Sequence, residues 1–100
     1  MGHVHRLKIW PEHFAAVKSG AKRAEFRKDD RTPRFEVGDM LVLEEYDPDL
    51  GIYTCEKGDP EGTHYAKVSH VARGGVIPEG YAMLSLRHPF DNLEVADAPR

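Results

Sequence analysis

The stretch HRLKIWPEHFAAVKSGAKRAEFRK, residues 5–28, decides the fold because it predicts a strand, a short helix and a second strand in direct succession. In residues 5–10, His5, Leu7 and Ile9 alternate with Arg6, Lys8 and Trp10. A period of two residues is typical of a β-strand. Pro11 then begins a helix of about two turns, because the first helical turn has no intrahelical partner for the N–H that proline lacks. Gly20 is typical of a helix end.

The second predicted strand, residues 22–27, has one apolar face and one charged face. Ala24 and Phe26 alternate with charged residues, so Glu25 and Arg27 project to the same side if the segment is extended. We expect Phe26 to face the core, and Glu25 and Arg27 to form a carboxylate–guanidinium pair on the other face. The simpler interpretation is a solvated charged face, since surface ion pairs are common.

The rest of the chain adds short strands separated by turns rich in proline and glycine. A turn is predicted at residues 37–39, and strand patterns follow at residues 40–46, 52–55, 64–73 and 81–87. These elements predict a mainly β (α+β) fold, a small β-barrel of five or six strands with one short helix after the first strand, because closure removes unpaired edges. The domain is expected over residues 1–88 and a flexible tail over residues 89–100.

The composition is that of one globular domain, with 31% charged and 40% hydrophobic residues in a chain of 100. Cys55 is the only cysteine, which excludes an internal disulfide and is compatible with a reducing cytoplasm. No apolar run approaches the roughly 20 residues that span a bilayer, so a cytoplasmic protein without membrane contact is expected. His3 and His5 would share a strand face, but zinc needs three or four ligands, so neither a metal nor another cofactor is expected.

Charge is distributed unevenly along the chain. Residues 1–35 hold nine Lys or Arg and four acids, for a net charge of +5, whereas residues 36–63 hold one Lys and nine acids, for a net charge of −8. Residues 64–100 are neutral, which gives the overall −3. A basic face on an acidic protein can concentrate positive potential on an anionic ligand. Alternatively, the two charged segments neutralise each other across neighbouring strands.

Several motifs occur together in this chain. The run from His5 to Glu12 is followed by the element Gly20-x-Lys22-x-x-Glu25-x-Arg27, by the turn Val37-Gly38-Asp39 and by the segment Ile77-Pro78-Glu79-Gly80-Tyr81. In this combination the chain resembles the ASCH domain, and more closely its small stand-alone bacterial and phage branch. The resemblance implies a PUA-like β-barrel with a helix beside a cleft. It also implies that Lys22, Glu25 and Arg27 face this cleft and that RNA or a nucleotide-like ligand is the partner.

ASCH relatives are associated with a ribonuclease activity and with hydrolysis of acylated cytidine nucleosides. The amidohydrolase type uses a lysine and a threonine of this motif together with a glutamate further along the chain. Lys22 matches the lysine, whereas Glu25 stands where the threonine would be. A carboxylate attacks an amide less readily than an activated hydroxyl does, so this departure counts against the amidohydrolase mechanism.

The leading hypothesis is therefore a domain that binds RNA or a nucleotide in a basic cleft. The residues expected to contact the ligand are Lys8, Trp10, Lys22, Glu25 and Arg27. The alternative is a small hydrolase acting on RNA or a modified nucleoside, with Lys22 as base and Glu25 as acid/base partner. A third hypothesis is a protein-interaction module in which the acidic residues 36–63 resemble nucleic acid. The sequence contains no signal for the oligomeric state.

Overall fold

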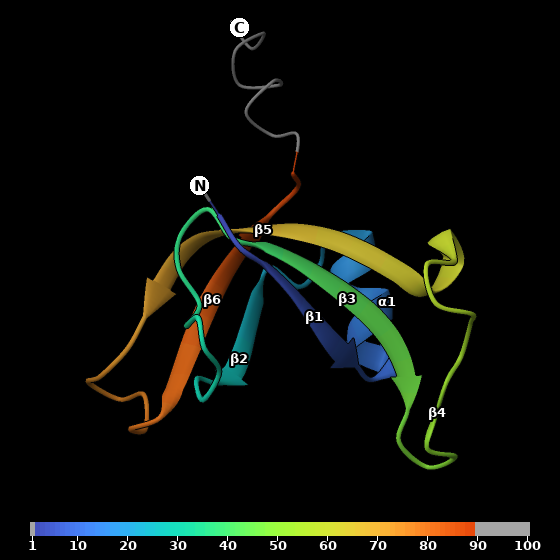
Figure 1. Ribbon diagram of the computed structural model, residues 1–100, viewed down its shortest axis with the longest axis horizontal. Helices are drawn as coiled ribbons and strands as arrows, with labels where there is room; N and C mark the ends of the chain where they lie inside the picture. The colour runs from blue at the N-terminus through green and yellow to red at the C-terminus, as the bar shows by residue number, and fades with distance from the viewer. Residues whose placement is uncertain (1, 90–100) are drawn as a thin grey trace, which may run out of the picture.

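The structure is a computed structural model that describes residues 2–89, and it is built around a curled sheet with a helix beside it (Figure 1). In chain order the elements are β1 (Val4–Ile9), α1 (Pro11–Ser19), β2 (Ala24–Lys28), β3 (Met40–Asp47), β4 (Ile52–Tyr53), a 3-10 turn (Pro60–Gly62), β5 (Thr63–Ala72) and β6 (Tyr81–Arg87). The tail expected at residues 89–100 lies, after Pro89, outside the described residues.

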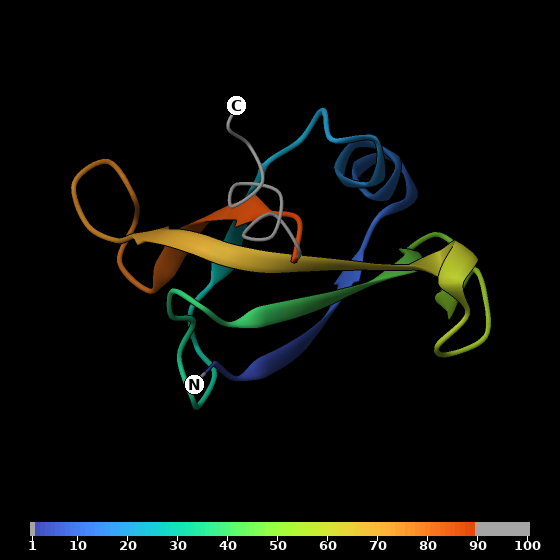
Figure 2. The same cartoon turned by 90° about the horizontal axis from the view of Figure 1, so that it is seen from above.

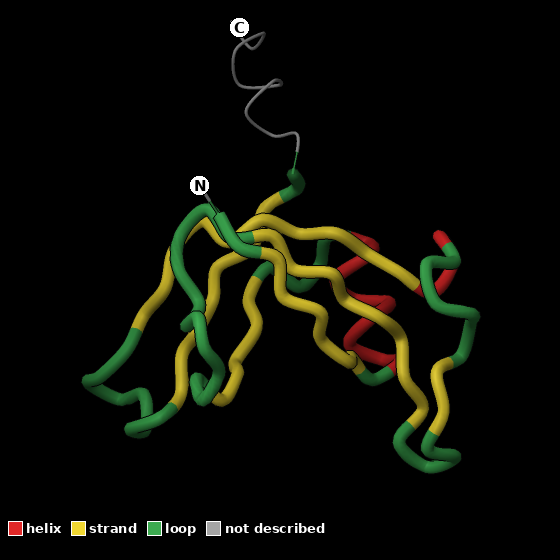
Figure 3. Tube along the Cα trace, viewed as in Figure 1, coloured by secondary structure: helices red, strands yellow, loops and turns green. Residues whose placement is uncertain are grey.

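The six strands form a sheet in the order β1-β3-β5-β6-β2, and β4 lies off this path and pairs with β3. β1 is parallel to β3, and all other pairs are antiparallel. The sheet curls into a half-barrel, so that its end strands β1 and β2 approach each other on the open side (Figure 2). Strands are the main regular structure of the described chain, and α1 follows β1 (Figure 3). The prediction of a mainly β domain of five or six strands with one short helix after the first strand is confirmed.

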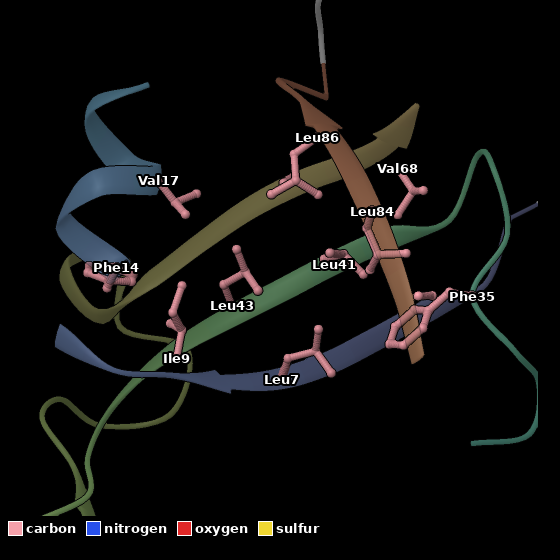
Figure 4. Close-up of a cluster of buried hydrophobic side chains, with 12 residues drawn as sticks. Leu7, Ile9, Phe14, Val17, Phe35, Leu41, Leu43, Val68, Leu84 and Leu86 are labelled. Atoms are coloured by element: carbon pink, nitrogen blue, oxygen red, sulfur yellow. The ribbon is translucent and has the colours of Figure 1, made fainter. Parts of the chain in front are cut away.

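Helix α1 begins and ends at signals that the sequence contains. Trp10 is the N-cap and Pro11 occupies the first turn. Gly20 has a positive φ of 87°, a conformation that glycine adopts without strain, and its N–H donates to the Val17 carbonyl at 3.1 Å. Phe14 and Val17 are buried and point from α1 toward the sheet (Figure 4). The helix therefore covers part of the concave side of the half-barrel.

The hydrophobic core lies between this helix and the concave face of the sheet, which we call the inner face (Figure 4). Its buried cluster consists of Leu7, Ile9, Phe14, Val17, Phe35, Leu41, Leu43, Ala66, Val68, Ala82, Leu84 and Leu86. In β1 and β6 every second residue is buried, as expected for strands with one face toward a core. Each large aliphatic side chain here contributes about 1.5–3 kcal/mol by leaving water.

Strand β2 turns the opposite face inward from the one predicted. Phe26 is 47% exposed and stacks on Tyr81 with ring centroids 5.1 Å apart, whereas Glu25 is only 3% exposed. The cause is the register with β6, which places Glu25 opposite Leu84 of the core, because paired residues share a face and a shift of one residue exchanges the faces. The expectation of a buried Phe26 and an outward Glu25 is therefore wrong.

Candidate functional site

A hollow of about 570 Å³ lies where residues of β1, β2, β3 and β4 come together. Its lining consists of Arg6, Leu7, Lys8, Trp10, Arg27, Arg31, Glu44, Tyr53 and Lys57. Five of these residues are Lys or Arg and one is acidic, although the whole chain has a net charge of −3. We call this site the basic hollow. Walls of one charge sign beside the low-dielectric protein concentrate positive potential in such a cavity.

Both end strands of the half-barrel contribute cations to the basic hollow. Arg6 and Lys8 lie on the outer face of β1, because they alternate with its buried residues. Arg27 starts from the inner face of β2, where it lies opposite Ala82, and its Nη2 donates to the Lys8 carbonyl at 2.7 Å. The Arg27 side chain thereby joins β1 to β2 across the open side of the sheet.

Aromatic rings lie next to these cations. The Trp10 and Tyr46 ring centroids are 6.1 Å apart, and Tyr46 meets Tyr53 edge-on at 5.1 Å. Lys8 places its Nζ 4.3 Å from the centre of the Tyr46 ring, within the range of a cation–π interaction. Trp10 is 42% exposed and Tyr53 is 47% exposed. These two rings consequently offer apolar surface to a flat ligand in the basic hollow.

The cations of the basic hollow differ in how far their charge is neutralised. Arg6 donates from Nη2 to Glu44 at 2.8 Å, so this pair adds little net charge. Lys8, Arg31 and Lys57 make no ion pair with any residue in the described range 2–89. These three side chains are therefore the ones whose charge is available to an anionic ligand.

Glu25 is at the centre of a buried ionic cluster, the Glu25 cluster, which it forms with Lys22 and Arg27. Lys22 Nζ donates to Glu25 Oε1 at 2.6 Å, and Arg27 Nε donates to Oε2 at 2.7 Å. Both carboxylate oxygens thus have a cationic donor, which is what allows a charged group to lie on the inner face beside apolar residues. The cluster as a whole keeps one positive charge in excess.

The residues singled out from the sequence do not all line one hollow, although Lys22, Glu25 and Arg27 contact one another. Lys8, Trp10 and Arg27 line the basic hollow, Lys22 lines a different hollow, and Glu25 is buried between Lys22 and Arg27. Lining residues that the sequence analysis did not single out include Arg31, Tyr53 and Lys57. The sequence does distinguish Lys57, because it is the only Lys or Arg among residues 36–63, but it does not distinguish Arg31 or Tyr53 in this way.

The second hollow, of about 260 Å³, lies between the end of α1 and strands β5 and β6. Its charged or titratable lining residues are Lys18, Lys22, Arg23, His64, Arg87 and His88. Burial lowers the pKa of His64 below its usual value, and the nearby His88 and Lys18 lower it further. This hollow is also basic, but no exposed aromatic ring lines it.

Asp39 and His5 form a buried pair at the N-terminal end of β1, the strand that contributes Arg6 and Lys8 to the basic hollow. Asp39 accepts a hydrogen bond from His5 Nε2 at 2.7 Å, from the His3 N–H at 2.9 Å and from the Glu36 N–H at 2.9 Å. Burial alone would raise the pKa of Asp39, but the hydrogen bonds from the His3 N–H, from His5 and from the Glu36 N–H lower it below the usual value. Asp39 thus ties the turn at residues 37–39 to β1.

Within residues 2–89, no group of three or more His, Cys, Asp or Glu side chains is placed to hold a metal ion. None of the helices in that range has the length and hydropathy needed to cross a bilayer.

Comparison with known proteins identifies a family. The model of a family described as "Domain of unknown function (DUF3850)" matches residues 4–86, which include every described strand and helix except the last residue of β6. An "Uncharacterized 12.9 kDa protein in GpA 3'region" of Escherichia phage P2 is 38% identical over 69 residues. That alignment covers 69% of this chain and 60% of the phage protein.

Proposed function

This chain belongs to the DUF3850 family of domains of unknown function, and we propose that its basic hollow binds a nucleotide or single-stranded RNA. The observation that carries the proposal is that Lys8, Arg31 and Lys57 lie without carboxylate partners in residues 2–89, beside two exposed aromatic rings. Cations bind phosphate and exposed rings stack on bases, so the two features together match this ligand class.

The size of the basic hollow supports the same ligand class. About 570 Å³ lies within the range of sites that hold small organic ligands, and Trp10 and Tyr53 add flat apolar surface. In single-strand binders a basic groove follows the backbone while aromatic side chains stack on successive bases. The resemblance to the ASCH domain points to the same partner, and we extend the proposal to a PUA-like arrangement of the half-barrel.

The Glu25 cluster favours binding over the hydrolase alternative. Lys22 donates its ammonium hydrogen to Glu25, and the second Glu25 oxygen accepts from Arg27. An ammonium group that donates to a carboxylate has no lone pair to accept a proton, and both oxygens of the carboxylate already accept hydrogen bonds from cations. We therefore expect purified protein to release no product from an acylated cytidine nucleoside. Multiple turnover that Glu25→Gln abolishes in a folded protein would instead establish the hydrolase.

Binding is tested with a fluorescently labelled single-stranded oligouridylate, whose anisotropy is followed over a range of salt concentrations. The double variant Lys8→Ala, Lys57→Ala should weaken binding about tenfold at low salt and reduce the slope of log K against log salt by between one and two. The matched control is Lys28→Ala, Lys67→Ala, which removes the same charge from side chains that do not line the basic hollow. It should change the affinity much less.

Trp10→Ala separates stacking from charge in the same assay. Loss of a stacking ring should weaken binding about fivefold or more at every salt concentration and leave the salt slope unchanged. Two results would contradict the proposal. One is the absence of binding to both the oligouridylate and mononucleotides at low salt, and the other is an equal loss of affinity in the two lysine double variants.

A further inference from the structure

Arg31 is the cation of the basic hollow that keeps a buried donor without a partner. Its Nε is buried and has no hydrogen-bond partner, and its Nη1 lies 3.4 Å from Nδ1 of His5, at the long end of a hydrogen bond. No carboxylate in residues 2–89 forms an ion pair with it. A buried donor without a partner carries a desolvation cost, and here no carboxylate of residues 2–89 competes with a ligand for the guanidinium.

The guanidinium of Arg31 is nevertheless held in place by its apolar and aromatic surroundings. Its Cζ lies 5.0 Å from the centre of the Phe35 ring, and Phe35 is fully buried. The same ring packs against His5, with centroids 4.6 Å apart. Arg31 therefore has a fixed support on one side and the basic hollow on the other, and its planar fork suits the oxygens of a phosphate.

The Asp39–His5 pair determines which nitrogen of His5 faces Arg31 as an acceptor. An ionised Asp39 only accepts hydrogen bonds, so His5 Nε2, at 2.7 Å, carries the hydrogen of this contact. In the neutral imidazole, Nδ1 is then the acceptor, and it is the nitrogen that faces the Arg31 Nη1. Asp39 is held in turn by the N–H groups of His3 and Glu36. The chain of contacts thus runs from a buried turn to the wall of the basic hollow.

We propose that Arg31 is the phosphate-binding residue of the basic hollow, and that His5 and Asp39 are positioning residues that present its guanidinium to the ligand. This inference rests on the proposed nucleotide or RNA binding and adds an orientation to it. The phosphate lies at Arg31, and the base lies toward Trp10 and Tyr53, which line the same cavity. Lys8 and Lys57 supply further charge but, as single ammonium groups, no bidentate geometry.

The test compares two probes, uridine 5′-monophosphate and uridine, by isothermal titration calorimetry with the full chain. The ratio of their affinities measures what the phosphate contributes, and a general loss of folding or of base stacking does not move it. Arg31→Gln should weaken binding of the monophosphate about tenfold and leave uridine binding within about twofold. Arg31→Lys keeps the charge without the fork and should fall between wild type and Arg31→Gln.

Positioning is tested with His5→Gln, which removes the Nδ1 acceptor but retains an amide that can donate to Asp39. It should lower the affinity ratio by about threefold while uridine binding is retained. Arg34→Gln is the matched charge control, because Arg34 is exposed, pairs with Asp29 and does not line the basic hollow. It should leave the ratio unchanged. Should His5→Gln fail to fold, Phe35→Leu, which removes the ring beneath the guanidinium, gives the same readout.

The outcomes distinguish this inference from the proposed function. A wild-type preference for the monophosphate that persists in Arg31→Gln overturns the assignment of Arg31 while binding itself stands. Absence of binding to both probes and to the labelled oligouridylate overturns the proposed function and this inference with it. Where the wild type binds only the oligouridylate, Arg31→Gln should reduce the salt slope by about one and Arg34→Gln should not. Equal slopes in these two variants would overturn the inference.

Discussion

The Glu25 cluster and the basic hollow contain the same residue types but differ in whether their charges are satisfied. In the Glu25 cluster a buried carboxylate receives one hydrogen bond from Lys22 and one from Arg27. In the basic hollow, Lys8, Arg31 and Lys57 line a cavity without such a partner among the described residues. The first arrangement stabilises the fold and the second is available for a ligand. Charged residues in a motif therefore indicate function only when their partners are known.

The largest effect is expected on stability, from Glu25→Ala in the Glu25 cluster. Removing the carboxylate leaves Lys22 and Arg27 without their partner on the inner face of the sheet, which should lower the free energy of unfolding by about 3 kcal/mol. Urea denaturation measures this loss. Glu79→Ala is the control, because Glu79 is exposed in the loop before β6, and it should cost less than about 0.5 kcal/mol. A loss below 1 kcal/mol for Glu25→Ala would mean that the cluster is not a structural anchor.

The second expected effect is a loss of stability in acid, because Asp29 and Asp39 are, like Glu25, carboxylates that accept hydrogen bonds within the fold. Burial favours the neutral form of Asp29, but hydrogen bonds from Arg73 and Arg34 and the charge of Arg73 lower its pKa below the usual value, and the pKa of Asp39 is lowered too. A carboxyl whose folded pKa is depressed stabilises the protein above its unfolded pKa of 3.8. Stability should therefore decline as the pH falls below about 4. Denaturation midpoints measured from pH 7 to pH 3 test this, and a flat profile would contradict it.

A direct comparison of two lysines gives the next effect, on binding. Lys8 lies in the basic hollow without a carboxylate partner, whereas Lys22 is paired with Glu25 and lines the second hollow. Lys8→Ala should weaken binding of the labelled oligouridylate about threefold to tenfold, and Lys22→Ala by less than about twofold once the folded fraction is taken into account. A larger loss for Lys22→Ala would move the ligand to the second hollow.

The smallest effect is expected for Phe26→Ala. The Phe26 ring is about half exposed and stacks on Tyr81 on the outer face, so its removal should cost about 1 kcal/mol. Truncation of a buried aromatic side chain costs about 3–5 kcal/mol, and Phe35→Ala supplies that reference because Phe35 is fully buried. A loss for Phe26→Ala as large as the loss for Phe35→Ala would show that β2 has the opposite face inward.

The uneven distribution of charge along the chain allowed two interpretations, a basic face for an anionic ligand and neutralisation between neighbouring strands, and the structure contains features of both. Basic residues 1–35 and acidic residues 36–63 meet where β1 runs parallel to β3, and there Arg6 pairs with Glu44. This contact is the neutralisation across strands that the charge pattern allowed. Lys8 lies opposite Glu44 in the register but extends over the Tyr46 ring. Part of the basic segment thus remains unneutralised and lines the basic hollow.

Local signals in the sequence determined the elements of this protein. Pro11 and Gly20 bound the helix because proline suits the first turn and glycine adopts a positive φ, and both effects act within a few residues. Alternation in residues 5–10 likewise predicted β1, and in the structure His5, Leu7 and Ile9 form its buried face. The mainly β fold class followed from the number and shortness of such elements.

Only the tertiary structure decided which face of β2 is buried and which cations remain unpaired. The face of β2 depends on its register with β6, far along the chain, and two cations made burial of Glu25 favourable in place of Phe26. Arg31 is held at the basic hollow by its contacts with Phe35 and His5, and the spacing of these residues in the sequence does not predict such contacts. Local backbone preferences act over a few residues, whereas desolvation and charge pairing depend on what the folded chain brings within a few ångströms.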